Sequence, residues 1–385
     1  MAVGPWGRRQ TPETEAKPAA PPRNVDQQLS CEQCGAVLSY APGTQNITCE
    51  YCGYSNEIED RPVEIIEHDL DAAIDQASGQ NSLEQDVQTV KCTTCGAGFT
   101  FDPDRHAGSC PFCGQAIVTT TGSHRQIKPA AILPFAIRED EAQATIRRWL
   151  KGLWFAPSKL TKFGKVDGSI SGVYLPYWTY DSQTDTNYTG QRGETYLEPV
   201  RVTRTVKGKR VVRTEMVQKV RWYPARGRVK RFFDDVLVLA SYSLPHWLTD
   251  KLEPWDLSDL RPYTEQYVAG FQSEAYQIAL KDGFGVANKK MQARIAADVR
   301  LDIGGDLQKI HRMDVRHSDS TFKHVLLPLW IGAFRFGDTT YRVAVNARTG
   351  DVQGERPYSV WKIAIAIILA LIVAGALYGI GQLAS

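Results

Sequence analysis

Hydrophobic and polar residues are distributed unevenly along this chain. The longest apolar run lies near its end, where residues 363–383 (IAIAIILALIVAGALYGIGQL) carry no charge. As an α-helix rising about 1.5 Å per residue, this run is about as long as the ~30 Å hydrocarbon core of a bilayer. A buried core helix is the alternative, but such helices are amphipathic, whereas this run is apolar on every side. The pattern therefore predicts a transmembrane anchor over 361–383.

The charges beside this run predict its orientation. Arg356 and Lys362 precede the run and no charge follows it. The positive-inside rule then keeps the N-terminal bulk of the chain in the cytoplasm. No apolar run opens the chain, so no secretory signal peptide contradicts this topology.

Residues 125–358 alternate between helical and strand-like patterns. Ile132–Ile137 predicts a strand or an extended entry to the domain, and acidic residues 139–141 begin a helix that ends with basic residues, as the helix dipole favours. The apolar stripe of this helix is Ala142, Ile146, Trp149, Leu150 and Leu153. Two more helical segments are predicted at Pro245–Lys251 and Tyr263–Lys281. A longer helix runs to about Ile303, because Met291, Ile295, Val299 and Ile303 recur every four residues before Gly304.

Two similar strand-like segments lie far apart in this domain. VYLPYW at 173–178 and VLLPLW at 325–330 share four residues at an offset of 152. They predict two related β-elements of one sheet, although chance could also produce four matches. Their aromatic residues are more typical of a buried sheet than of a ligand-stacking surface.

The N-terminal part of the chain contains two segments whose composition does not favour a hydrophobic core. Residues 1–28 are rich in Pro, Ala and charge, which predicts a disordered tail. Residues 58–89 are acidic and contain one helical stretch at Ile66–Gln76, followed by the flexible sequence SGQNS. They predict a spacer helix and a linker.

All eight cysteines fall in four C-x-x-C pairs. Fourteen residues separate the two pairs of each set, and the whole pattern repeats after sixty-one residues. In C-x-x-C-G the glycine permits a positive φ, so that both thiolates face one ion, and two such knuckles make a tetrahedral Cys₄ site. A redox C-x-x-C would instead be one pair beside a βαβ unit. The pattern predicts two structural Zn²⁺ ions, bound by Cys31, Cys34, Cys49 and Cys52 in a ribbon at 29–57 and by Cys92, Cys95, Cys110 and Cys113 in a ribbon at 90–119.

Fold class follows from these segments together. The sequence predicts an α+β protein with two small N-terminal zinc ribbons, a mixed α+β soluble domain and one C-terminal transmembrane helix. His106 lies inside the second ribbon. With four cysteines available there, it is expected to be a bystander.

The charge of the ribbons indicates whether their partner is a protein or a nucleic acid. The net charge is +2, and the first ribbon contains Glu32 and Glu50 but no Lys or Arg. A Cys₄–Zn²⁺ centre itself carries a formal charge of −2. Binding to phosphates requires clustered cations, so the ribbons favour a protein-docking or structural role over nucleic acid.

One strongly basic segment stands out from this balance. Arg201–Arg231 contains twelve Lys or Arg and one acidic residue, and its alternation predicts a hairpin near 200–231. Such a strip could contact anionic lipid, at about 1 kcal/mol per cation, an acidic partner or the acidic segment between the ribbons, or it could be a solvated face. Few stacking aromatics interleave with it, which disfavours nucleic acid.

Motifs for catalysis are missing from the sequence. It contains no phosphate-binding loop, dinucleotide fingerprint, zinc-protease motif or nucleophile elbow, and its seven histidines are scattered. The sequence therefore predicts that the protein is not an enzyme.

Several longer segments resemble a known family. WLKGLWFAPSKL at 149–160, GVYLPYWTYD at 172–181 and the stretch from TFKHVLLPLW at 321 to ERPYS at 359, together with the paired ribbons, resemble bacterial YdjG-like proteins with TFIIB-type zinc ribbons. That family is often mislabelled as primosomal protein N′ or replication helicase. No phosphate-binding loop is present here to support ATP hydrolysis.

The resemblance implies a function that the residues alone do not. It implies an envelope-stress or membrane-protection complex at the inner membrane, with a sibling zinc-ribbon membrane protein, an SPFH-type scaffold and a phage-shock-type effector as partners. The eight cysteines match as zinc ligands, and no other site carries over. The expected function is a membrane-anchored scaffold that recruits cytosolic partners; the alternative is a membrane-tethered nucleic-acid-binding protein.

Overall fold

The protein is organised around one large mixed sheet, in which the long strands are antiparallel. The computed structural model describes residues 31–36, 38–49, 51–58, 65–76, 84–92, 97–100, 107–110, 112, 116–118, 122–157, 160, 170–206, 209–336 and 339–383. The sheet has nine strands, and its main path is β11 (Lys209–Leu239), β10 (Ser171–Val206), β14 (Leu307–Phe336), β15 (Thr339–Asn346) and β16 (Val352–Gly354). The short strands β3 (His68–Asp69), β9 (Ala131–Ile132), β12 (Arg261–Pro262) and β13 (Gln272–Ser273) complete it. Of these, β13 and β9 pair in parallel with β10 and β14.

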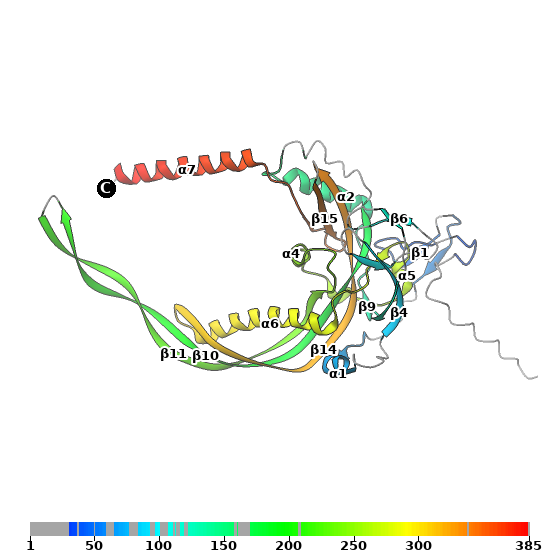
Figure 1. The fold of residues 1–385 in the computed structure, drawn as a ribbon, viewed down its shortest axis with the longest axis horizontal. Helices are drawn as coiled ribbons and strands as arrows, with labels where there is room; N and C mark the ends of the chain where they lie inside the picture. The colour runs from blue at the N-terminus through cyan, green and yellow to red at the C-terminus, as the bar shows by residue number, and fades with distance from the viewer. Residues whose placement is uncertain are drawn as a thin grey trace, which may run out of the picture.

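Three very long strands extend from the body of the molecule as a curved blade (Figure 1), which consists of β10, β11 and the first part of β14. β14 pairs with β10 only as far as Gly193↔Leu307, whereas β11 continues beside β10 to Val206↔Lys209. The outer part of the blade is therefore a two-stranded ribbon. The predicted basic hairpin is confirmed as this ribbon and the adjoining part of β11.

The helix α6 (Leu280–Ile303) covers one face of the blade (Figure 1). Met291, Ile295, Val299 and Ile303 are buried, which confirms the apolar stripe that the sequence predicted. The single helix predicted at Tyr263–Lys281 is wrong, because this range contains only the short α5 (Glu265–Val268) and, at its end, the first two residues of α6. After α5, Gly270 has a φ of 83° and β13 pairs with β10, so pairing with the sheet overrides the local helical pattern.

A close contact between α6 and the blade gives a testable prediction. Trp178 donates from its ring N–H to Ile278 O at 2.9 Å, and Tyr180 donates to Leu280 O at 2.7 Å, so both rings are fixed. A Cβ at Gly283 would lie 2.4 Å from the Tyr180 hydroxyl oxygen and 2.8 Å from Trp178 Cδ1, whereas one at Gly285 meets no described atom within 4 Å. We expect Gly283→Ala to lower the free energy of unfolding by about 1–3 kcal/mol.

The matched control is Gly285→Ala on the same helix. Alanine is favoured over glycine in a helix interior, so this variant should gain up to about 1 kcal/mol. Urea unfolding at neutral pH measures both changes. Equal effects from the two substitutions would contradict the packing described for α6.

Several predicted elements are observed in the body of the molecule, the part of the structure outside the blade. α2 (Glu139–Gly152) buries Ala142, Ile146 and Leu150, and the predicted helical segment at 245–251 forms α4 (His246–Thr249) and η1 (Asp250–Leu252). A second short 3₁₀ turn, η2, spans Leu257–Asp259. Of the segment Ile132–Ile137, predicted to be a strand or an extended entry, only Ile132 belongs to a strand, β9 (Ala131–Ile132).

The two similar segments of the sequence are neighbours in the sheet. Val173 pairs with Leu329, and Tyr177 pairs with Val325, in an antiparallel register. The prediction that they belong to one sheet is confirmed. Their aromatic side chains are core residues, since Tyr174 and Trp178 have no exposed surface.

The C-terminal helix α7 (Val360–Leu383) forms where the apolar run predicted a helix. Lys362 in its first turn donates to Trp154 O and Ala156 O, at 3.1 and 2.8 Å. Among the residues that the structure describes, no helix is both long enough and apolar enough to cross a membrane.

This finding corrects three linked predictions. The transmembrane anchor over 361–383, the single-pass location in the inner membrane with a cytoplasmic bulk, and the α+β fold class that included this anchor are wrong. The architecture is dominated by the nine-stranded sheet.

Smaller sheets form the N-terminal part of the structure. β1 (Asn46–Thr48) pairs with β2 (Ser55–Glu57), and β6 (Ala107–Ser109) pairs with β7 (Ala116–Val118). β4 (Glu84–Lys91) pairs with β5 (Gly98–Thr100) and β8 (Gly122–Ile127). In the chain, α1 (Leu70–Gln76) lies between β3 and β4 and is the observed part of the predicted spacer helix. The predicted tail at 1–28 and the SGQNS linker lie outside the described residues.

Candidate zinc site

Four cysteine thiols meet in the first ribbon. The Sγ atoms of Cys31, Cys34, Cys49 and Cys52 all lie within 4.8 Å of one another. Cys31 Sγ is 3.5 Å from Cys52 Sγ, and Cys34 Sγ is 3.6 Å from Cys49 Sγ. Four thiolates at about 2.3 Å from one Zn²⁺ in a tetrahedron have sulfur atoms nearly 4 Å apart. The cluster has the size and the ligand set of a structural Cys₄ zinc site.

Local backbone geometry explains why the thiols converge. Gly35 and Gly53, one residue after each C-x-x-C pair, both have a φ of 73°. Each closes its knuckle with a hydrogen bond, from Gly35 N to Cys31 O at 2.8 Å and from Gly53 N to Cys49 O at 2.9 Å. Since a positive φ costs glycine little, the sequence C-x-x-C-G encodes this turn directly.

The ribbon is attached firmly to the body of the protein. Tyr40 N donates to Ala269 O, and Gly43 N donates to Phe135 O, both at 2.9 Å. The Tyr40 ring packs edge-on against Tyr267 with centroids 5.4 Å apart. Cys31 and Cys49 are buried in the same hydrophobic cluster as Phe135. The cluster of four thiols is therefore continuous with the core of the sheet.

The second ribbon repeats the backbone of the first where it is described. Ala107 pairs with Val118 as Asn46 pairs with Glu57, sixty-one residues earlier. Cys92 N donates to Ala97 O at 2.8 Å, which repeats the bond from Cys31 N to Ala36 O. Cys92 and Cys110 are buried. Cys95, Cys113 and His106 lie outside the described residues, so the structure shows one four-cysteine cluster and the second zinc site stays a prediction.

The acidic segment between the ribbons makes a contact that the sequence did not indicate. Glu67 accepts from the ammonium of Lys323 at 2.8 Å, and Asp235 also lies 2.8 Å from it. Lys323 is almost fully buried, at 7% exposure. Burial opposes its charge, but hydrogen bonds to Asp235 and Glu67 raise the pKa of Lys323. Burial raises the pKa of the nearby Asp181 carboxyl to about 6.

This network lies where the long strands are irregular. The β10–β11 register shifts between Tyr180 and Ser182, and Asp235 has a φ of 50°. Bulges of this kind aim side chains toward one point, which brings carboxylates from β10 and β11 to a lysine of β14. No spacing in the sequence could reveal this cluster, because its members come from four distant segments.

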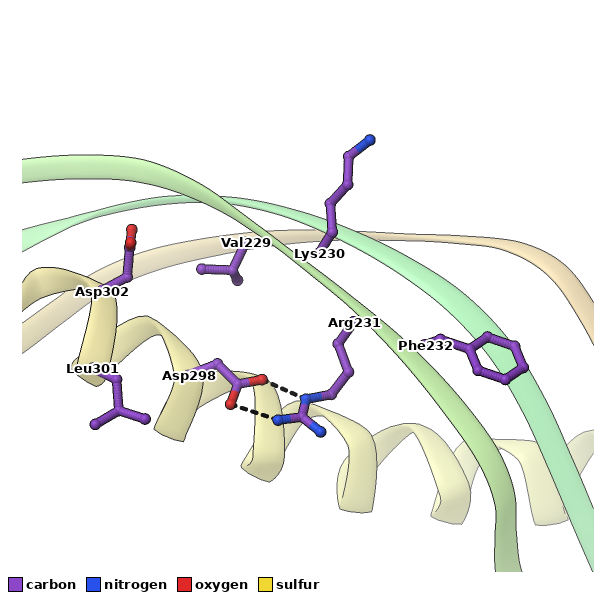
Figure 2. A pocket seen from close by; sticks show the side chains of 7 residues that line it. All are labelled: Val229, Lys230, Arg231, Phe232, Asp298, Leu301 and Asp302. Atoms are coloured by element: carbon purple, nitrogen blue, oxygen red, sulfur yellow. Dashed lines mark hydrogen bonds and ion pairs between the residues drawn. The ribbon is translucent and has the colours of Figure 1, made fainter.

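A surface depression lies between β11 and α6 (Figure 2). Arg231 crosses it to Asp298, with Nε to Oδ2 at 2.5 Å and Nη2 to Oδ1 at 2.8 Å. This bidentate pair fixes the helix beneath the strand. The cations of the basic segment therefore differ in role: Arg231 forms a structural ion pair with α6, whereas others, such as Lys230, are exposed.

The class of the molecule follows from these observations: a protein with a large mixed sheet that carries, at its N-terminal side, a four-cysteine ribbon able to hold a metal ion. The chain is similar to a protein of Bacillus subtilis (strain 168) described as uncharacterized protein YdjG. The two are 24% identical over 336 residues, which cover 87% of this chain and 91% of the relative. No family model matches the chain, and no solved structure matches it. The similarity supports the resemblance to YdjG-like proteins and carries no function with it.

Proposed function

We propose that this protein is a zinc-dependent adaptor whose ribbons are docking surfaces for protein partners. The cluster of four thiols, all within 4.8 Å of one another, carries the proposal. Four protein ligands leave no open coordination position for a substrate, which is typical of a structural rather than a catalytic zinc. Because the cluster is continuous with the core, the ion would make the outer surface of the ribbon rigid.

The outer surface of the first ribbon has the character of a protein contact. Tyr51, between Cys49 and Cys52, is 82% exposed, and Tyr54 is 39% exposed. The described ribbon carries no cation that could hold a phosphate. Exposed tyrosines beside a rigid turn are typical of protein interfaces. The family resemblance suggests the candidates: a sibling zinc-ribbon protein, an SPFH-type scaffold and a phage-shock-type effector.

The test compares two tyrosine variants of the full-length, zinc-loaded chain. Tyr51→Ser changes the ribbon surface, and the control Tyr242→Ser changes a residue of the body that is 68% exposed. Crosslinked partners are quantified by mass spectrometry, with zinc content measured in parallel. We expect Tyr51→Ser to retain zinc but to lose a stoichiometric partner that the wild type and the control both capture.

Two outcomes would count against the adaptor. One is an unchanged partner set in the Tyr51→Ser variant. The other is recovery of nucleic acid alone, removed by salt, which would support the nucleic-acid alternative.

A further inference from the structure

Among the described residues, no strand pairs with the outer edge of the long strand β11. In the described sheet β11 is the terminal strand, and its pairing partner is β10 along its whole length. An edge strand presents a row of backbone N–H and C=O groups to solvent, and another chain can extend the sheet there. The edge includes residues 226–232 (RGRVKRF), of which residues 229–232 line the depression above α6 (Figure 2).

The two faces at this edge have opposite chemistry. Side chains alternate along a strand, so Arg226, Arg228 and Lys230 share one face. Val229 packs in the cluster that includes α6, and Arg231 bonds to Asp298 of α6, so the three cations lie on the face away from the helix. Figure 2 shows Lys230 directed away from α6. The Lys230 and Arg228 side chains are 62% and 58% exposed.

The helix side of the edge offers apolar surface instead. Leu301 of α6 lines the depression together with Val229 and is 81% exposed. A strand added beside β11 would place alternate side chains over this leucine. Its other side chains would lie next to the cations of β11, where opposite charges directly across a strand pair are favourable.

We propose that the edge at residues 226–232 binds an extended segment of a partner protein in which acidic and apolar residues alternate. The segment adds one strand to the sheet. Its acidic residues pair with Arg226 and Lys230, and its apolar residues cover Leu301. This mode of recognition draws affinity from main-chain hydrogen bonds and specificity from the alternation.

Other occupants fit these observations less well. A second copy paired through the same edge would set the cations of one β11 against those of the other, which is unfavourable. Nucleic acid cannot extend a sheet, because it has no peptide N–H and C=O groups to pair with the backbone of an edge strand. A protein strand satisfies the edge, the charge and the exposed leucine together.

The experiment uses the full-length, zinc-loaded chain and a fluorescein-labelled peptide, Ser-Glu-Val-Glu-Val-Glu-Val-Glu-Ser. Fluorescence anisotropy measures binding, and hydrogen exchange measures protection of the β11 amides. We expect Lys230→Glu and Leu301→Asp each to weaken binding about tenfold, because each reverses or removes one of the two alternating contacts. The amides of residues 226–232 should gain protection when the peptide is added.

The matched control is Arg312→Glu, an exposed cation on β14 at the opposite edge of the blade, 72% exposed in its side chain. It should leave peptide binding within twofold of wild type. A peptide of the same composition with its glutamates in one block should bind at least tenfold more weakly. The proposal is overturned if the block peptide or an oligothymidylate binds as well, if Arg312→Glu weakens binding as much as Lys230→Glu, or if no β11 amide gains protection.

Discussion

Replacing Cys49 with Ser should remove one equivalent of bound zinc and destabilise the protein strongly. Cys49 is 1% exposed and belongs to the same hydrophobic cluster as Phe135, so loss of the ion would loosen a ribbon that is part of the core. Structural zinc contributes apparent binding free energies of about 10–16 kcal/mol in isolated fingers. Because this ribbon is also held by packing, we expect a smaller loss of at least about 3 kcal/mol. Zinc quantification and urea unfolding measure the two effects.

Chelation supplies the control for this variant. If Cys49 acts through the ion, a strong chelator should lower the stability of the wild type but change the Cys49→Ser protein less. Cys92→Ser in the second ribbon should remove a different equivalent of zinc, which would test the site that the structure does not show. A Cys49→Ser protein with unchanged zinc content and stability would refute the proposed site.

The ribbons were predictable because their chemistry is local. Cys31 and Cys34 are three residues apart, and Gly35 supplies the positive φ of the turn, so a short stretch of sequence encodes half of the site. The stripe of α6 was predictable for the same reason, since Met291, Ile295 and Val299 repeat with the period of a helix. Both features depend on neighbours within one or two turns of the chain.

The blade and the lysine network were not predictable in this way. The basic segment predicted a hairpin, but only the structure shows that β11 continues to Leu239 and that β14 covers β10 as far as Gly193. Glu67 and Lys323 are 256 residues apart in the chain. Such contacts are set by strand register and by bulges, which no local pattern encodes.

The error over 361–383 has a different origin. The hydropathy of that run predicted a helix, and a helix forms. The prediction then assumed that this helix lies in a bilayer, which hydropathy alone does not establish. What the described residues show is a helix whose first turn is tied to the loop after α2 through Lys362.

A buried histidine should make stability depend on pH. His324 is 3% exposed, and its Nδ1–H donates to Ile127 O at 2.7 Å. In the described part of the chain its Nε2 has no hydrogen-bond partner, and the rings of Trp178 and Tyr276 pack against it. Burial lowers the pKa of His324 to about 4, because a proton on Nε2 would place a charge among these rings.

The sign of the effect follows from proton binding in the two states. Below about pH 6.5 the unfolded chain binds a proton at this histidine that the folded chain does not bind until about pH 4. The free energy of unfolding should therefore fall as the pH falls from 6.5 to 4, by about 3 kcal/mol for this group, and change no further below. His324→Gln keeps a donor for Ile127 O but cannot be protonated, so it should lose this part of the slope.

Urea unfolding of the wild type and of His324→Gln is measured at pH 7 and at pH 4.5. The other titratable groups are the same in both proteins, so the difference between the two changes in free energy of unfolding is the contribution of His324. His246→Gln, at an exposed position, is the control and should keep the wild-type slope. If the free energy of unfolding of His324→Gln depended on pH as steeply as that of the wild type, a group other than His324 would be responsible for this dependence. A reduced slope in the His324 variant alone would show that the neutral ring is a fixed part of the sheet's core.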